Sequence, residues 1–65
     1  MNNYSLSIYY CATHERHEIA LLEDGNIVTI DEDQVIIYAH NKQELDDLMN
    51  NIITNGYEYL IEMFK

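Results

Sequence analysis

EIALLEDGNIVTI, residues 18–30, consists of two apolar runs on either side of a turn dipeptide. Asp24-Gly25 tolerates the positive φ angles of a tight two-residue turn, and strand-forming residues flank it on both sides. The stretch therefore predicts an antiparallel hairpin with strands at 18–23 and 26–30.

A further strand is predicted on each side of this hairpin. Apolar and polar residues alternate along residues 3–12, which is the period-two pattern of a half-buried strand. QVIIYAH, residues 34–40, is apolar on both faces and follows a polar turn at residues 31–33, so we expect a strand in the interior of the sheet. In chain order, the four strands are expected to form an antiparallel meander.

An amphipathic helix is predicted after the last of these strands. Asn41 is a good N-cap, and Glu44 stands three residues later as in a capping box. Gly56 after Asn55 is typical of a helix C-terminus. Between them, one apolar stripe follows the helical spacing: Leu45, Leu48, Met49, Ile52 and Ile53.

The last nine residues, YEYLIEMFK, carry two competing patterns. Tyr57, Tyr59, Ile61 and Met63 alternate as in a strand, whereas Tyr57, Leu60, Ile61 and Phe64 have helical spacing. Their tyrosine and isoleucine content favours a strand.

The segments together predict one α+β domain over residues 1–65, a four- or five-stranded antiparallel sheet with one amphipathic helix. The helix is expected on the face formed by Tyr4, Leu6, Ile8 and Tyr10. The opposite face is too apolar to be fully wet, so we expect a second copy of the chain, or else the C-terminal segment, to cover it. The predicted residues of that second interface are Tyr9, Cys11, Leu22, Ile27, Ile36 and Tyr38.

Charge is the strongest feature of the composition. Twelve Asp and Glu oppose three Lys and Arg, which gives a formal charge of −9, while 48% of the residues are hydrophobic. An acidic disordered segment would be poor in apolar residues, so this chain is expected to fold. It has one cysteine, no apolar run approaching the roughly 20 residues of a membrane span, and a start, MNNYSLSIYY, without a basic leader region. A cytoplasmic protein without membrane contact is expected.

THERHE, residues 13–18, resembles the His-Glu-x-x-His zinc motif but places its histidines one residue too close. His14 and His17 would point to opposite faces of an extended chain, and His40 is expected at the far end of another strand. We therefore expect a solvated turn, with no metal and no cofactor, in which Arg16 pairs with an acid of residues 31–33. Catalytic motifs are also missing from the sequence, and we expect no enzyme activity.

The acidic residues are expected to gather on the two rims of the meander. Glu23 and Asp24 would share one rim with the helix start, and Glu15, Glu18 and the turn at residues 31–33 would lie on the other rim. Acids at turns and helix starts are common, but here few basic residues compensate them. The predicted partner-binding residues are Glu23, Asp24, Asp31, Glu32, Asp33, Glu44, Asp46 and Asp47.

In size and charge the chain resembles the small phage-encoded inhibitors that occupy nucleic-acid sites on host enzymes, including anti-CRISPR proteins and DNA mimics. That resemblance implies a basic nucleic-acid-binding protein as partner, such as a host defence nuclease, whose groove is blocked by carboxylates. Direct binding to nucleic acid is disfavoured because the chain has no basic patch. The alternative is a homodimeric structural or regulatory module, antitoxin-like or an assembly protein, in which the acid only solubilises the chain.

Overall fold

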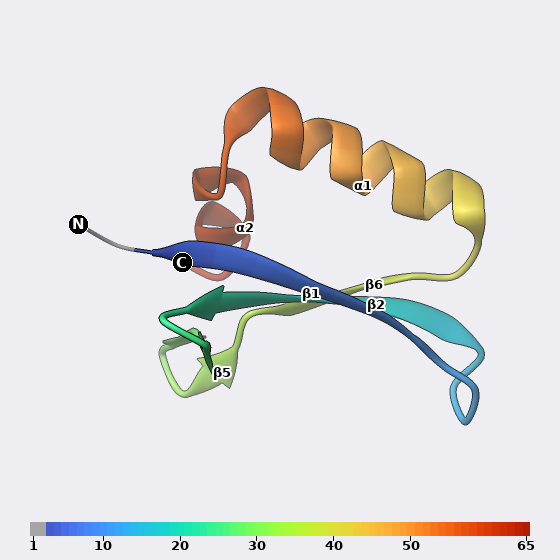
Figure 1. The fold of residues 1–65 in the computed structure, drawn as a ribbon, viewed down its shortest axis with the longest axis horizontal. Coiled ribbons are helices and arrows are strands. Elements are labelled where there is room, and N and C mark those ends of the chain that lie inside the picture. Colours follow the sequence, from blue (N-terminus) through green and yellow to red (C-terminus); the bar gives the residue numbers. More distant parts are fainter. Residues whose placement is uncertain (1–2) are drawn as a thin grey trace.

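The computed structural model describes residues 3–65 and has the expected α+β architecture. In chain order, the elements are β1 Tyr4–Cys11, β2 Arg16–Glu23, β3 Asn26–Ile27, β4 Thr29–Ile30, β5 Asp33–Gln34, β6 Ile36–Ala39, α1 Lys42–Asn55 and α2 Glu58–Met63. Strands β1, β2, β3 and β6 form one antiparallel sheet, and β4 and β5 form a separate two-stranded hairpin. Both helices lie on one side of the sheet, and the β4–β5 hairpin projects on the other (Figure 1).

The first two strands pair along their whole length. Tyr4 lies opposite Glu23 at one end of this pair, and Cys11 lies opposite Arg16 at the other. The period-two pattern of residues 3–12 therefore predicted β1 correctly, and the Asp24-Gly25 turn joins β2 to β3 as expected.

The third position in the sheet is shared by β3 and β6, which corrects the predicted meander. Ile27 of β3 pairs with Leu22 of β2, and Ile36 of β6 pairs with Ala20 of the same strand. β6 therefore lies beside β2 at an edge of the sheet, not in its interior. β3 is too short to pair with all of β2, and the backbone groups of β2 that it leaves unpaired find their partners in β6.

Leu21 holds the junction between these two short strands. Its carbonyl accepts a hydrogen bond from the Val28 N–H at 2.9 Å, and its N–H donates to the Val35 carbonyl at 3.0 Å. The Val35 N–H in turn donates to the Val28 carbonyl at 2.8 Å, which closes the base of the β4–β5 hairpin. Residues 29–34 thus leave the sheet and return to it at one point.

Helix α1 begins and ends where the sequence predicts. The Asn41 side chain accepts a hydrogen bond from the Glu44 N–H at 2.9 Å, as an N-cap does. Gly56 has a φ of 77°, and its N–H donates to the Ile52 carbonyl at 2.7 Å. The glycine therefore terminates the helix and turns the chain back over the same face of the sheet.

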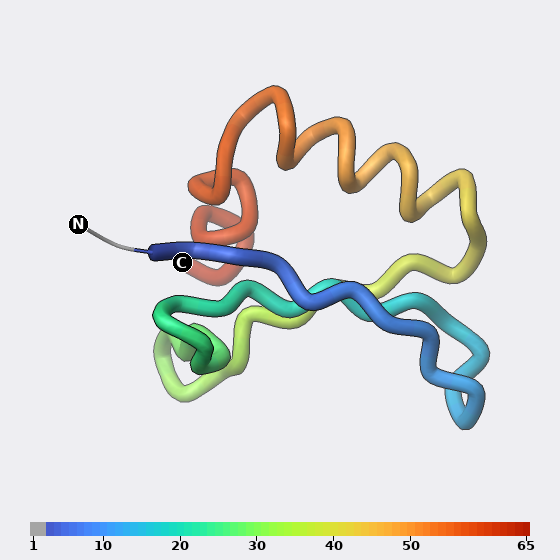
Figure 2. Tube along the Cα trace, in the orientation of Figure 1, coloured from blue at the N-terminus to red at the C-terminus, as the bar shows by residue number. Residues whose placement is uncertain are grey.

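The C-terminal segment is a helix, so the prediction of a strand is wrong. Leu60 of α2 is fully buried in the core, and Ile61 and Phe64 pack against the same cluster. The tight turn at Gly56 brings this segment onto the helix-covered face of the sheet, where its apolar stripe at helical spacing packs against the core. α2 lies beside α1 (Figure 2). The C-terminal segment therefore does not cover the opposite face of the sheet, which was one of the two coverings we expected for it.

The core lies between the sheet and the two helices. Its buried side chains are Ile19, Leu21, Val35, Ile37, Ile52 and Leu60. Tyr4 and Leu6 pack against this cluster, but Ile8 and Tyr10 on the same face of β1 remain 46% and 57% exposed. The helices thus cover only the first half of β1. No helix within residues 3–65 is long and apolar enough to cross a membrane.

Candidate functional site

The face of the sheet away from the helices carries a polar cluster at the end where β1 turns into β2. At its centre is Glu18, whose residue surface is only 8% exposed. The Tyr9 hydroxyl donates to Glu18 Oε1 at 2.6 Å, and Arg16 Nε donates to Glu18 Oε2 at 3.1 Å. The Arg16 guanidinium also lies 3.7 Å from the centre of the Tyr38 ring. Two side chains, Tyr9 and Arg16, therefore hold the carboxylate in place, and Tyr38 packs against the second of them.

These contacts shift the pKa values of the Glu18 carboxyl and the Tyr9 hydroxyl. The hydrogen bond from Tyr9 lowers the pKa of Glu18 below its usual value; burial opposes this effect, and the hydrogen bond and charge of Arg16 reinforce it. The same hydrogen bond is the main cause of a raised pKa for the Tyr9 hydroxyl. Glu18 is therefore a fixed anion at neutral pH.

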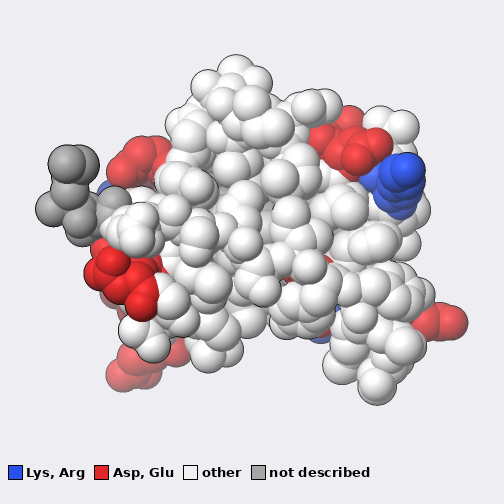
Figure 3. Space-filling model, viewed as in Figure 1, with Lys and Arg blue, Asp and Glu red and all other residues white. Residues whose placement is uncertain are grey.

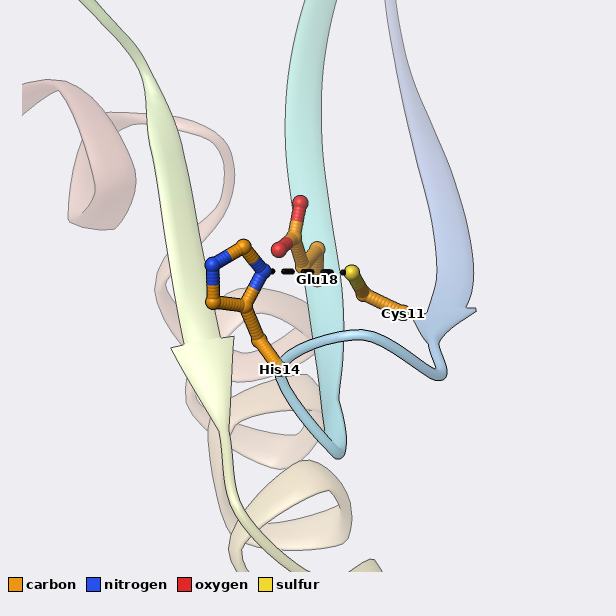
Figure 4. Close-up of side chains that lie close together, drawn as sticks. All are labelled: Cys11, His14 and Glu18. Carbon is orange, nitrogen blue, oxygen red and sulfur yellow. Dashed lines mark hydrogen bonds between the residues drawn. The ribbon is translucent and has the colours of Figure 1, made fainter.

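Cys11 and His14 extend this cluster across the β1–β2 turn. Cys11 Sγ and His14 Nδ1 are 3.4 Å apart, and both side chains point towards the carboxylate of Glu18 (Figure 4). The potential ligand atoms of the three residues all lie within 4.8 Å of one another. They form the one such group of three or more Cys, His, Asp or Glu residues found within residues 3–65.

This group was not predicted from the sequence, in which Cys11 and the stretch of residues 13–18 belong to separate predicted segments. His17, the other half of the motif, instead contacts the Tyr10 ring at 5.1 Å between centroids, and neither His17 nor His40 joins the cluster. The available signal was the two-residue spacing between Cys11 and His14, which is comparable to the two- to four-residue spacing of paired cysteine ligands in zinc sites. Glu18 could be added only from the strand register, which pairs Cys11 with Arg16.

The predicted acidic residues are distributed differently from the two expected rims. β6 runs antiparallel to β2 and ends with Ala39 opposite His17, so the start of α1 lies near the β1–β2 turn. The turn at Glu23 and Asp24 is at the other end of β2, beside the β4–β5 hairpin (Figures 1 and 2). The end with the two hairpin turns therefore carries Glu23, Asp24, Asp31, Glu32 and Asp33, and the end with the helix start carries Glu44, Asp46 and Asp47.

The space-filling view shows acidic side chains at both ends of the molecule and a mostly uncharged surface between them (Figure 3). Of the eight predicted partner-binding residues, Glu23 and Glu44 are half-buried and the other six are exposed. Within residues 3–65, two ion pairs form, Arg16 with Glu18 and Lys65 with Glu62. Arg16 thus pairs within β2 and not with residues 31–33, which lie at the far end of that strand.

The residues predicted for a second interface do share the face away from the helices. Tyr9 and Tyr38 flank Glu18 across three strands, and Leu22 lies opposite Ile27. Tyr9, Ile27 and Tyr38 are exposed, whereas Cys11, Leu22 and Ile36 are half-buried. The face is thus partly polar at the Glu18 end and apolar towards the hairpins.

Comparisons of the chain with protein-family models, with curated proteins and with solved structures gave no match.

Proposed function

We propose that this protein is a cytoplasmic inhibitor that binds the basic groove of a nucleic-acid-binding protein and excludes nucleic acid from it. The observation that supports this function is the scarcity of compensating cations. Of twelve acidic residues, ten have no ion pair within residues 3–65, because two of the three Lys and Arg side chains pair with Glu18 and Glu62. These ten carboxylates remain available to the cations of a partner.

The density of this charge is close to that of a nucleic-acid strand. The molecule measures 33 Å along its longest axis and carries a formal charge of −9. This corresponds to one net negative charge per roughly 3.7 Å, near the value of about 3.4 Å per phosphate along a single strand and about half the density of a duplex. A groove that binds a single strand therefore fits this charge better than one that binds a duplex.

The end with the two hairpin turns is the better candidate for the contact. It presents Asp24, Asp31, Glu32 and Asp33 as exposed side chains on turns that project from the sheet. At the other end, Glu44 and Asp47 already bond to side chains of their own helix or its cap, Asn41 and Gln43. The hairpin end thus offers more carboxylates without such bonds.

The test requires the partner, which is obtained by co-purification of the tagged protein from its host cell. Asp31→Lys with Asp33→Lys should weaken binding strongly, and Asp46→Lys with Asp47→Lys, the matched pair at the other end, should weaken it less. A single-stranded oligonucleotide should compete for the partner, and the affinity should fall steeply as salt rises towards about 0.5 M, because ions screen exposed charges.

An affinity that neither charge reversal nor salt changes would contradict this function. It would show that the acid solubilises the chain and that another surface makes the contact.

A second function, a homodimeric structural or regulatory module, is supported by the free edge of β1. This edge strand contains no charged residue, although the chain as a whole is strongly acidic. The Asp24 N–H donates a hydrogen bond to the Asn3 carbonyl. The backbone N–H and C=O groups of the odd-numbered residues of β1 therefore face β2, and those of the even-numbered residues face away from the sheet. Within residues 3–65, the outward backbone groups of Leu6, Ile8 and Tyr10 form no hydrogen bond with another strand.

A long uncharged edge invites pairing with another strand, and natural sheets usually protect such edges with charge. Sedimentation would test whether two copies pair through β1. We expect Ile8→Lys to convert a dimer into a monomer, while Ile53→Lys, a control at an exposed apolar position of α1, leaves it intact. A dimer that survives Ile8→Lys but not Tyr38→Glu would place the contact on the face away from the helices, and a monomer at every concentration would exclude the module.

A further inference from the structure

We propose that Cys11, His14 and Glu18 form a binding site for Zn²⁺ at the β1–β2 turn. The three side chains supply a thiolate sulfur, an imidazole nitrogen and a carboxylate oxygen, which are the three donor types that zinc accepts in proteins. This inference is independent of the proposed acidic interface, most of which lies at the other end of the sheet.

The distances suit a tetrahedral ion. Zinc bond lengths of about 2.3 Å to sulfur and about 2.0–2.2 Å to nitrogen and oxygen keep the ligand atoms of a tetrahedral site roughly 3.4–3.6 Å apart. Cys11 Sγ and His14 Nδ1 are already 3.4 Å apart, and no pair among the three ligand atoms exceeds 4.8 Å. A shift of up to about 1.4 Å, which the exposed His14 side chain can supply by rotation, would complete the arrangement.

Glu18 is the preorganised member of the set. The hydrogen bonds from Tyr9 and Arg16 fix its carboxylate, and each oxygen accepts one of them. A carboxylate has about four lone-pair positions, so a position remains for a metal ion. Such outer contacts orient metal ligands in known sites, which makes Tyr9 a positioning residue in this proposal.

The charges also balance. The thiolate of Cys11 and the carboxylate of Glu18 together neutralise a divalent cation, so Arg16 would face a neutral unit and not a bare dication. The formal charge of −9 on the chain further raises the local concentration of cations. Three protein ligands leave the fourth zinc position to water or to a donor from another molecule.

The simplest competing explanation is that Cys11 and His14 form only a weak hydrogen bond in a solvated turn. Titration with Co²⁺ alone, used as a spectroscopic substitute for Zn²⁺, distinguishes the two. We expect one equivalent to bind with a thiolate-to-cobalt charge-transfer band and the intense visible bands of four-coordinate cobalt. Zn²⁺ should abolish both signals, and excess Mg²⁺ should not, because magnesium prefers oxygen ligands.

The variants identify the ligands. Cys11→Ser should remove the charge-transfer band, and His14→Ala and Glu18→Gln should each weaken binding at least about 10-fold, while His40→Ala, an exposed histidine outside the group, leaves it unchanged. Tyr9→Phe should weaken binding about 10-fold with the band retained. Because the Cys11 thiol must lose its proton, calorimetry in two buffers should detect proton release on binding.

Two results would overturn the site: cobalt binding without a charge-transfer band, or an unchanged affinity in Cys11→Ser. Absence of any binding up to millimolar Co²⁺ would do the same. Circular dichroism of each variant checks that the sheet is intact, which is expected because Cys11 and His14 lie outside the core cluster.

Discussion

The β4–β5 turn offers a substitution that separates backbone strain from charge. Asp31 and Glu32 have φ angles of 50° and 72° and form the two-residue loop between Ile30 and Asp33. The left-handed region costs a non-glycine residue about 1–2 kcal/mol, and glycine loses about 0.5–1 kcal/mol of this advantage through the greater freedom of the unfolded chain. Glu32→Gly should therefore stabilise the fold by about 0.5–1 kcal/mol.

For a domain of this size, that gain corresponds to a rise in Tm of roughly 2–8 °C. Differential scanning calorimetry would measure it, with Glu32→Gln as the control, because glutamine removes the same charge but keeps the Cβ and its strain. If both variants melt at the same temperature, charge repulsion and not backbone conformation explains any gain, and the reasoning from φ is refuted. Under the proposed function, both variants should lose the same partner affinity, so stability and binding would change in opposite directions for Glu32→Gly.

Further substitutions test other parts of the fold. Gly56→Ala should destabilise the protein by about 1–3 kcal/mol, because a φ of 77° with a ψ of −176° is nearly exclusive to glycine and no steric contact accompanies the change; urea denaturation that shows a gain would contradict the observed end of α1. Leu60→Ala should cost about 2–5 kcal/mol in the same assay, since the side chain is fully buried, and this loss is a large part of the roughly 3–10 kcal/mol available to a chain of this length. The lowered pKa of Glu18 means that its bonds stabilise the fold above the unfolded-state value near about 4.3 and that this contribution is lost as pH falls through the folded-state value. In an NMR titration, Tyr9→Phe should move the Glu18 midpoint upwards, and an unmoved midpoint would rule out the hydrogen bond as the main cause.

Local features of the sequence predicted local features of the structure. The alternation along β1, the Asp24-Gly25 turn, the Asn41 cap and the Gly56 terminus each depend on neighbouring residues, and all four are confirmed. Their energetics are set within a few residues, so the sequence alone contains the required information.

The errors all concern contacts between distant segments. The position of β6 depended on how much of β2 the short strand β3 leaves unpaired, which no pattern within residues 34–40 reveals. The tail could form a strand or a helix with similar local preference, and burial of Leu60 under α1 favours the helix. The Cys11, His14 and Glu18 group likewise required the β1–β2 register, because only that register brings Glu18 beneath the turn.

The closed base of the β4–β5 hairpin has a consequence for how the surface can change over evolution. Backbone hydrogen bonds join Val28 and Val35 to each other and to Leu21. The pairing of the main sheet therefore does not depend on residues 29–34. Insertions, deletions and substitutions at the exposed residues 31–34 can then accumulate without altering the strand register beneath them, whereas Ile30 packs against the core. Under the proposed function, a lineage that follows a changing target could replace residues 31–34 while it retains the same scaffold, and an engineer could insert a binding peptide at the same position.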